Sequence, residues 1–367
     1  MRTGMIYHKN RLAGWATLQL MTVSLLLTVA AGCGGSEGLS PPGESPVAAA
    51  PADPVGSAPT DSAAGPLDST VTPTDSSALP PTDPGTVSTA TSASGTQPGI
   101  VFGSYYMDVS DLNSVHTGTL RGGGVTADNV LSLLSGVKAK GARIVLKLCM
   151  GEDKYVQNSD GTFSFTKWKD LVDRFKNVNF GPYISDGTLL GHFLIDEPQR
   201  AAKWGGKVIS QATIEAMAKY SKQLWPGMTT VVRVVPSWLA SAPVTYTYLD
   251  AGWLQYASGK GDASTMVASE AAAAKNKGLG LVVGLNILDG GNGSSGVKGW
   301  TSGKYAMSAS EIRNYGSTLL NQSYACGFYN WTYNYFGPTY YDRSDIKSAL
   351  SDLSTKAKAH VRTSCSQ

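Results

Sequence analysis

Cysteine and histidine are scarce in this 367-residue chain, which has four of each. His8 lies in an N-terminal stretch rich in basic and apolar residues, and no His or Cys cluster has the spacing of a metal site. A dense Lys/Arg cluster is also lacking, although residues 99–367 hold 27 basic and 20 acidic side chains. Nucleic-acid binding normally requires a concentrated basic patch or stripe. We therefore expect no metal, no cofactor and no nucleic-acid partner, and we expect a monomer.

The first 33 residues have the pattern of an export signal. A head with three basic residues precedes an apolar segment over residues 18–29, and small residues follow. The cysteine directly after Gly32 resembles the lipobox of bacterial lipoproteins, in which this cysteine is diacylated and becomes the mature first residue. The resemblance implies a signal peptide over residues 1–32 and a membrane anchor through the lipid on Cys33. An uncleaved anchor or a plain secretory signal is the alternative.

Each of these interpretations places the rest of the chain outside the cytoplasm. Gly34 follows the cysteine, which in Gram-negative lipoproteins favours the outer membrane. We expect a lipid-anchored protein of the cell envelope, in the outer membrane or at the cell surface, facing the periplasm or the exterior.

Residues 33–98 lack basic side chains altogether. From residue 36 to residue 98 the chain holds 12 of the 18 prolines and seven acidic residues, and the remainder is mostly Ser, Thr, Ala and Gly. This stretch has too little apolar material to offset the loss of chain entropy on folding. We predict a disordered, extended linker between the lipidated cysteine and the folded domain.

Residues 99–367 are long enough for one α/β barrel domain. Predicted strands cover residues 100–108, 143–150, 189–196, 229–235, 248–256, 279–287 and 327–333. Predicted helices cover residues 126–140, 166–177, 210–224, 265–277, 308–321 and 345–360, with Thr126 and Ser308 as N-caps and Gly141 and Gly278 at helix C-termini. This alternation favours parallel strands, as in a (β/α)8 TIM barrel. Only seven strands are clear, so an irregular or incomplete barrel stays open, and a doubly wound open sheet is the alternative.

Three cysteines remain after Cys33. Cys326 begins the last predicted strand, and the final helix should return Cys365 to the same end of the barrel. Outside the cytoplasm this pair is expected to be oxidised, so we predict a Cys326–Cys365 disulfide. Cys149 is then an unpaired thiol. We expect it to be buried and inert, because the sequence places no histidine to activate it as a nucleophile.

The run at residues 189–198 is the most informative part of the chain. An apolar strand ends in two adjacent carboxylates, Asp196 and Glu197, followed by Pro198. In parallel barrels, catalytic side chains collect at the C-terminal ends of the strands. Because adjacent carboxylates repel, we expect one pKa to rise toward neutrality, as a general acid requires. The alternative is that either carboxylate pairs with Arg233 or Lys147, which are charged residues inside otherwise apolar strands.

The Asp-Glu-Pro strand end, together with Asn330-Trp331-Thr332-Tyr333 on the last strand, resembles the TIM-barrel glycoside hydrolases. In their large retaining clan, Asn-Glu-Pro ends one strand and its Glu is the acid/base. A Trp on the final strand lines the sugar subsite. The resemblance implies that Glu197 is the general acid, that Asp196 stands in for the Asn, and that Trp331 is the sugar platform.

The chain departs from that clan at the penultimate strand, where the clan has its nucleophilic Glu. Asn286 lies in this place and cannot be a carboxylate nucleophile. Glycoside hydrolysis normally uses two carboxyl groups, about 5 Å apart for retention or about 6.5–9.5 Å for inversion. Asp289, just past the strand, and Asp108, at the end of the first strand, are the candidates for the second carboxylate.

Further candidates for substrate contacts follow the strand ends. Gln255 and Asn286 are late in their strands and are able to bond sugar hydroxyls, and Arg233 is a supporting charge. Aromatic residues at or just after strand ends suit sugar stacking, with core or rim packing as the alternative: Tyr106, Trp204, Trp238, Tyr256, Trp300, Trp331 and Tyr333. Residues 289–305 form a glycine-rich loop, interpreted as a mobile lid or a flexible insertion.

These features favour a glycoside hydrolase that acts on a polysaccharide or oligosaccharide outside the cytoplasm. Two alternatives remain. The domain is a noncatalytic glycan-binding lipoprotein that uses the same cleft, or an envelope scaffold with a vestigial site and a filled barrel top.

Overall fold

The computed structural model describes residues 98–362, 364 and 365. The predicted signal peptide, the lipidated Cys33 and the predicted linker up to residue 97 lie outside the described residues. Among the helices in the described part of the chain, none combines the length and the apolar character needed to cross a bilayer.

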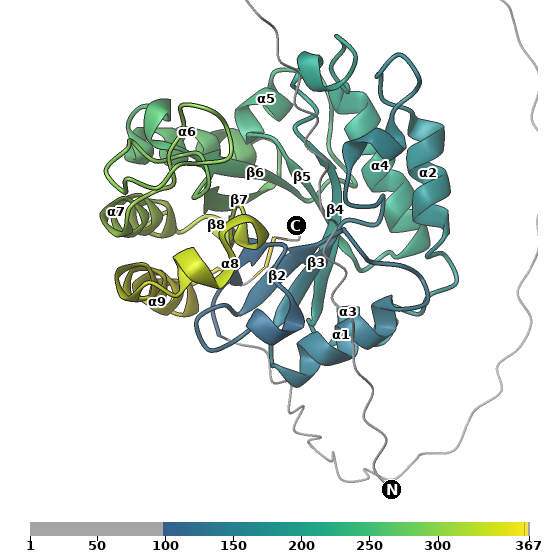
Figure 1. Cartoon of the computed structure of the whole chain (residues 1–367). Coiled ribbons are helices and arrows are strands. Elements are labelled where there is room, and N and C mark those ends of the chain that lie inside the picture. The colour runs from purple at the N-terminus through teal and green to yellow at the C-terminus, as the bar shows by residue number, and fades with distance from the viewer. Residues whose placement is uncertain (1–97, 363, 366–367) are drawn as a thin grey trace, which may run out of the picture. The chain divides into compact units, whose positions relative to one another are not determined.

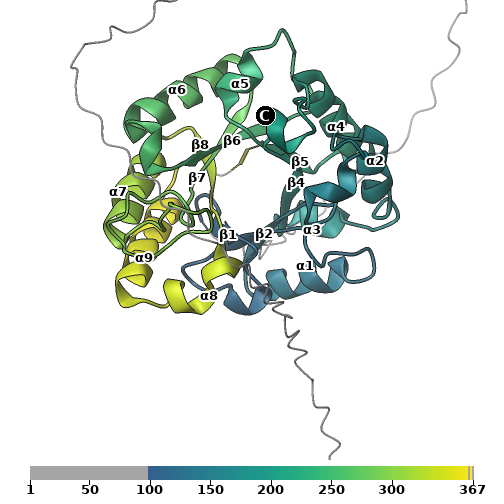
Figure 2. The same cartoon turned by 45° about the horizontal axis from the view of Figure 1, so that its top comes forward.

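Eight parallel strands form a closed barrel in sequence order. The strands are β1 (Phe102–Tyr105), β2 (Gly118–Arg121), β3 (Arg143–Leu146), β4 (Leu189–Asp196), β5 (Thr229–Arg233), β6 (Ala251–Tyr256), β7 (Gly280–Leu285) and β8 (Ala325–Asn330). Figure 1 and Figure 2 show them at the centre of a ring of helices. The TIM-barrel prediction is confirmed, and the open-sheet alternative is wrong. The strand absent from the sequence prediction is β2, which pairs with both β1 and β3.

The helical layer contains nine α-helices in the described residues. They are α1 (Val130–Ala139), α2 (Phe165–Asp173), α3 (Gly181–Ser185), α4 (Gln211–Leu224), α5 (Pro236–Ala240), α6 (Ala263–Asn276), α7 (Ala309–Leu320), α8 (Tyr333–Tyr341) and α9 (Ser344–Lys358). Short 3-10 helices are η1 (Val109–Asp111), η2 (Asp153–Val156), η3 (Ala201–Lys203) and η4 (Ser258–Lys260).

Local sequence signals explain several helix ends. Ser308 caps α7 in a reciprocal capping box with Glu311, as predicted. Gly141 and Gly278 follow α1 and α6 with φ angles of 61° and 68°, which glycine adopts without steric cost. Thr126 is not the N-cap of α1, because the helix starts one turn later and its N-cap is Asn129. The Thr126 hydroxyl instead accepts a hydrogen bond from the Asn129 amide at 3.3 Å.

Both faces of the strands are buried, so apolar residues follow one another along a strand, as in Ile144, Val145 and Leu146 of β3. Outward side chains such as Ile144 and Leu146 pack with the helices. Inward side chains, including Val145, Phe193 and Trp253, fill the middle of the barrel. Toward the C-terminal strand ends the interior changes from apolar to charged side chains. This end of the barrel is therefore where a polar site can lie.

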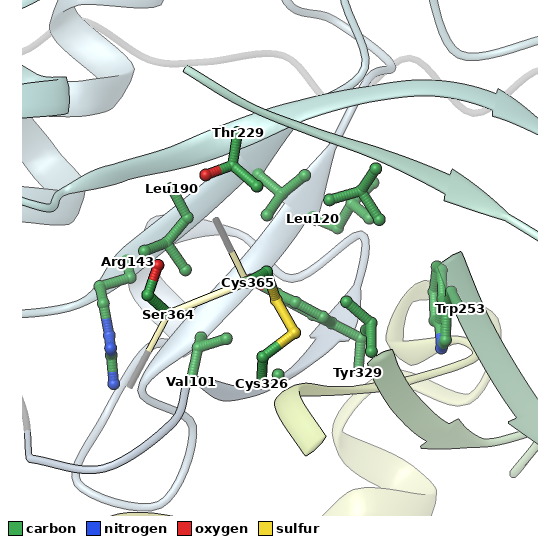
Figure 3. Close-up of a pocket in the computed structure, with 15 residues that line it drawn as sticks. Val101, Leu120, Arg143, Leu190, Thr229, Trp253, Cys326, Tyr329, Ser364 and Cys365 are labelled. Atoms are coloured by element: carbon green, nitrogen blue, oxygen red, sulfur yellow. A yellow bond between two sulfur atoms is a disulfide. The ribbon is translucent and has the colours of Figure 1, made fainter. Parts of the chain in front are cut away.

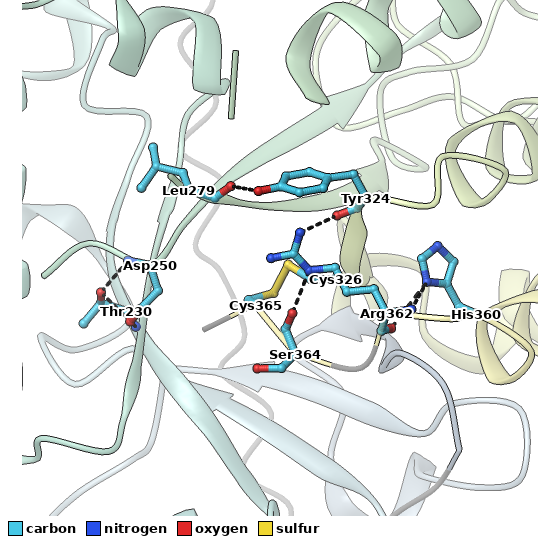
Figure 4. The surroundings of a disulfide bond; sticks show 9 residues. All are labelled: Thr230, Asp250, Leu279, Tyr324, Cys326, His360, Arg362, Ser364 and Cys365. Carbon is cyan, nitrogen blue, oxygen red and sulfur yellow. Dashed lines mark hydrogen bonds between the residues drawn. A yellow bond between two sulfur atoms is a disulfide. The ribbon is translucent and has the colours of Figure 1, made fainter. Parts of the chain in front are cut away.

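At the opposite end, the C-terminal tail crosses the base of the barrel. The predicted disulfide is confirmed, since Cys326 on β8 is bonded to Cys365 across a Cα–Cα distance of 5.0 Å. Arg362 donates hydrogen bonds to the carbonyl oxygens of Tyr324 and Ser364 at 3.3 and 2.9 Å, and its guanidinium lies 4.1 Å from the centre of the Tyr324 ring (Figure 4). The tail is thus fixed by both covalent and polar contacts.

A small cavity of about 70 Å³ separates the tail from the apolar interior. Figure 3 shows the disulfide near Val101, which directly precedes β1, and near Leu120 of β2 and Tyr329 of β8. Cys149, the remaining described cysteine, is a buried free thiol as predicted. Burial raises the pKa of Cys149 to about 11, so the group is a neutral thiol at physiological pH.

Candidate functional site at the C-terminal ends of the strands

A backbone turn at Glu197 brings the two adjacent carboxylates to the same cleft. Strand β4 ends at Asp196, and Glu197 has a φ of 50°, in the left-handed region that non-glycine residues seldom adopt. The Glu197 amide donates to the Arg233 carbonyl at 3.1 Å, and the Trp204 indole donates to the Glu197 carbonyl at 3.0 Å. These bonds hold the turn, so that both carboxylates line one cleft although consecutive strand residues normally face opposite ways.

Asp196 is locked in ion pairs. Its side chain bonds the Arg233 Nε, and its Oδ2 lies 3.0 Å from Arg233 Nη2 and 2.7 Å from Lys203 Nζ. Burial alone would raise the pKa of this carboxyl, but Arg233 and then Lys203 hold it well below the usual range. The expected upward pKa shift therefore does not occur at Asp196. Its pairing with Arg233 is the alternative that the sequence left open.

Glu197 is more accessible than Asp196. Its Oε2 lies 2.7 Å from Arg200 Nη1, and its Oε1 lies 3.2 Å from Arg233 Nη2. The Arg200 side chain is 60% exposed, so this pair competes with water and is weak. Glu197 is thus anchored on one side by a buried arginine and faces the open cleft on the other.

The charges continue across the barrel top toward β3. Lys147 Nζ lies 2.8 Å from Asp153 Oδ1, and Lys203 Nζ lies 2.7 Å from Asp153 Oδ2. Lys203 therefore bridges Asp153 and Asp196 and ties η2 to the end of β4. Lys147 neutralises a carboxylate at the barrel top, as its place inside an apolar strand suggested. Its partner, Asp153, was not among the sequence candidates, and nor were Lys203 and Arg200.

The cleft has a volume of about 550 Å³. It is lined by Asp153, Asp196, Glu197, Arg200, Ala202, Lys203, Arg233, Gln255, Asn286, Asp289 and Trp331. Gln255 accepts a hydrogen bond from Arg233 Nη1 at 2.7 Å, which orients its amide, and its buried Nε2 has no partner. Trp331, at the start of a cis peptide bond, forms part of the wall with its ring 5.3 Å from the Arg233 guanidinium carbon.

Asp289 is the one cleft carboxylate in the described residues that forms no ion pair. Its Oδ1 accepts from the Thr301 amide at 3.1 Å, and its Oδ2 accepts from the Thr301 hydroxyl at 2.9 Å. Its own amide donates to Asn286 Oδ1 at 3.0 Å. Asp289 thus joins the end of β7 to the loop over residues 289–305, and both predicted residues, Asn286 and Asp289, reach the cleft.

Seven other sequence candidates do not line this cleft, and two of them, Trp204 and Tyr256, are buried in the core. Asp108 is 68% exposed and bonds Arg121. Tyr106 donates a hydrogen bond to the Gly151 carbonyl at 3.4 Å, and Trp238 lies on α5 against the core. Trp300 is 69% exposed in the 289–305 loop, with its ring 5.1 Å from that of Tyr335. Tyr333 faces a second pocket formed with α9.

The arrangement allows acid–base or binding chemistry on a polar ligand. In the part of the chain that the structure describes, no group of three or more His, Cys, Asp or Glu side chains is placed to hold a metal ion. Within the cleft, Asp289 forms no ion pair, whereas Glu197 lies 2.7 Å from Arg200, 3.2 Å from Arg233 and 3.8 Å from Lys203. Amide groups of Gln255 and Asn286 and the Trp331 ring complete the walls.

Solved structures with a similar fold include several glycosidases. An exo-β-1,4-mannosidase from Opitutaceae bacterium strain TAV5 has a TM-score of 0.46 and 12% identity, over 73% of this chain and 61% of that chain. The catalytic domain of a family GH18 chitinase from the fern Peteris ryukyuensis has a TM-score of 0.40 and 14% identity, over 72% and 100%. A Parabacteroides merdae β-glucuronidase has a TM-score of 0.41 and 11% identity, over 65% of this chain and 33% of that chain.

The chain therefore spans about a third of the β-glucuronidase that it matches. No protein-family model matches the sequence, and no curated protein sequence matches it. At these identities and TM-scores the comparisons concern the barrel fold and assign no activity to this chain.

Proposed function

We propose that the cleft binds carbohydrate and hydrolyses a glycosidic bond, with Glu197 as the general acid. The observation that carries the proposal is the convergence of Glu197, Asp289 and the Trp331 ring on one open cleft at the C-terminal strand ends. A sugar presents apolar C–H faces to an aromatic ring, and its hydroxyls require amide and carboxylate partners. Gln255, whose Nε2 donor is unpaired, supplies such a partner.

In this proposal the buried ion pairs position the acid rather than react. Asp196 stays ionised against Arg233 and fixes the guanidinium that contacts Glu197 Oε1. When substrate binds, it displaces the solvent-exposed Arg200 from Glu197 Oε2, and Glu197 takes up a proton from solvent. As the glycosidic C–O bond breaks, the leaving oxygen receives this proton, and a water molecule adds to the anomeric carbon and loses its own proton. Arg233 is thus a positioning residue, and Glu197 contacts the leaving group.

Asp289 is the proposed second carboxylate. It lines the same cleft, and its two bonds to Thr301 leave lone pairs on both oxygens for a water molecule or a sugar carbon. Asp108 is not proposed for this role, because it points to solvent and pairs with Arg121.

Noncatalytic glycan binding is the second candidate, and two observations favour it. Asn286 lies at the end of β7, where the retaining clan has its nucleophile, and Glu197 is engaged by two arginines. The open cleft does not favour the scaffold interpretation, which expected a filled barrel top.

A panel of soluble polysaccharides incubated with the full chain separates these functions. The parent, Glu197→Gln and Asp289→Asn are compared with Glu152→Gln, whose exposed side chain lies outside the cleft. Loss of sugar release in Glu197→Gln and Asp289→Asn, but not in Glu152→Gln, supports hydrolysis with two carboxylates. Binding without release in all four proteins supports the noncatalytic function. If the proteins neither bind nor release sugar, both functions are rejected.

We also propose that the protein is a monomer, exported and anchored to the cell envelope through a lipid on Cys33. Metabolic labelling with a radioactive fatty acid tests the anchor. The parent should carry the label and the Cys33→Ser variant should not, whereas equal labelling would reject the anchor.

A further inference from the structure

A second pocket lies on the outside of the barrel. Among the described residues, the crossover from β1 to β2 contains only the 3-10 helix η1 and no α-helix. The loop over residues 111–116 and the helices α8 and α9 enclose a pocket of about 430 Å³ there. This volume is within the range of about 300–1,000 Å³ typical of small-molecule sites. The pocket therefore lies where the helical layer lacks an α-helix between β1 and β2, and it is large enough for a small ligand.

His116 is the unusual residue of this pocket. Its side chain lines the pocket and is 8% exposed, yet neither Nδ1 nor Nε2 has a hydrogen-bond partner. Leaving a buried donor or acceptor unsatisfied costs free energy, which a ligand that supplies the missing partner recovers. Burial lowers the pKa of His116 to about 4, so the ring is neutral and has one N–H donor and one nitrogen acceptor. Hydroxyl groups match this ring, because one is able to accept from the N–H and another is able to donate to the unprotonated nitrogen.

Aromatic rings surround the imidazole. Phe102 stacks on it at a centroid distance of 6.1 Å, and the rings of Tyr333 and Tyr341 meet it edge-on at 6.4 and 6.2 Å. Tyr333 and Tyr341 also line the pocket, with centroids 4.8 Å apart. They form an aromatic wall of the kind against which the C–H face of a sugar ring packs.

The rim excludes anionic ligands. Two aspartates, Asp111 and Asp342, face one lysine, Lys347, which already pairs with Asp342 at 2.9 Å. Carboxylates and the nearby Asn113 and Ser348 side chains are partners for neutral hydroxyls.

We propose that this pocket is a second carbohydrate-binding site, which takes a neutral sugar unit against the wall formed by His116, Tyr333 and Tyr341. The sugar class rests on the function proposed above, whereas the pocket is a separate site. Trp331 faces the first cleft, and Tyr333, two residues later, faces the second. The two sites therefore share one chain segment and hold sugars on opposite sides of it.

The test uses the few histidines of the chain. With 15N-labelled histidine only a few ring systems give signals, since the chain has His116, His192 and His360 after residue 33, and His116→Phe, which keeps an aromatic ring, assigns the one of interest. Short oligosaccharides of cellulose, mannan, xylan and chitin are titrated as probes. The His116 signals should shift with at least one probe while those of His192, buried against Ser221, do not. Loss of its hydrogen bonds in His116→Phe should weaken binding at this site by about tenfold.

A second variant, at the rim of the pocket, tests the site even if His116→Phe does not fold. Asp342→Asn changes an exposed side chain and should also weaken the response of His116. Shifts of His116 in both the parent and Glu197→Gln, without any sugar release, would support this site and reject hydrolysis in the cleft. Sugar release together with unmoved His116 signals would overturn this site alone. A response to methylammonium and to no neutral sugar would also overturn it.

Discussion

The disulfide at the base of the barrel should contribute a large share of the stability. It closes a loop between residues 39 positions apart, Cys326 and Cys365. The chain-entropy relation for such a loop gives about 4 kcal/mol at 25 °C, because the cross-link restricts the unfolded chain. For a domain of this size, about 2 °C per kcal/mol converts this into a midpoint lower by about 8 °C.

Equilibrium urea unfolding of the full chain, oxidised and reduced, measures this contribution. The double variant Cys326→Ser/Cys365→Ser should match the reduced parent and should not respond to reductant, although Cys149 is still present. The native far-UV signal should persist, since Leu350 and Leu353 of α9 are buried in the core without the help of the disulfide. An unfolding free energy that stays the same on reduction would refute the reasoning.

Two further predictions concern buried groups. Asp196→Asn should destabilise the protein by about 3–5 kcal/mol in urea unfolding, because it leaves Arg233 buried without its main partner. Since the pKa of Asp196 is lowered in the fold, its ion pairs stabilise the protein at any pH above the ordinary aspartate value of about 4. That contribution is lost as the pH falls below this value, so Asp196→Asn should flatten the acid limb of the stability–pH profile, and an unchanged limb would contradict the assignment. Cys149 should resist iodoacetamide at pH 8 in the native state and react after unfolding, because burial raises the pKa of its thiol to about 11. Mass spectrometry measures the labelling, and rapid labelling of the native protein would contradict the burial of this thiol.

Much of the fold could be predicted because the strands are buried on both faces. Strand β4 has the predicted bounds, residues 189–196, since its apolar run is long and ends at a proline-terminated turn. Strand β2 escaped prediction because it has four residues, Gly-Thr-Leu-Arg, with one aliphatic side chain. Its place in the barrel depends on pairing with β1 and β3, which is a tertiary effect.

The short helices α3 and α5 were also absent from the prediction. Each has five residues and begins with a proline in its first turn. Periodicity over a single turn is too weak a signal to identify such elements.

The candidate site was predicted where a strand end carries its own signal. Glu197, Gln255, Asn286 and Trp331 follow this rule, and all line the cleft. Asp153 and Lys203 lie in the 3-10 helices η2 and η3, Arg200 directly precedes η3, and nothing in the local sequence marks them. Asp153 joins the site through its ion pair with Lys203, about 50 residues along the chain, whereas Arg200 pairs with Glu197, three residues away.

Aromatic residues show the limit of the same rule. Trp300 and Tyr333 follow strand ends as Trp331 does, but one lies in an exposed loop and the other faces the outer pocket. The direction of a side chain beyond the last strand residue depends on the loop conformation, which the sequence pattern does not encode.

The most direct test of the account is the rate of sugar release from one glycan by the full chain and by its Glu197→Gln variant, with equal unfolding free energies verified for both. General acid catalysis accounts for a factor of about 10²–10⁴, so the variant should be slower by at least about a hundredfold. Equal rates in the two proteins would contradict the assignment of Glu197 as the catalytic acid.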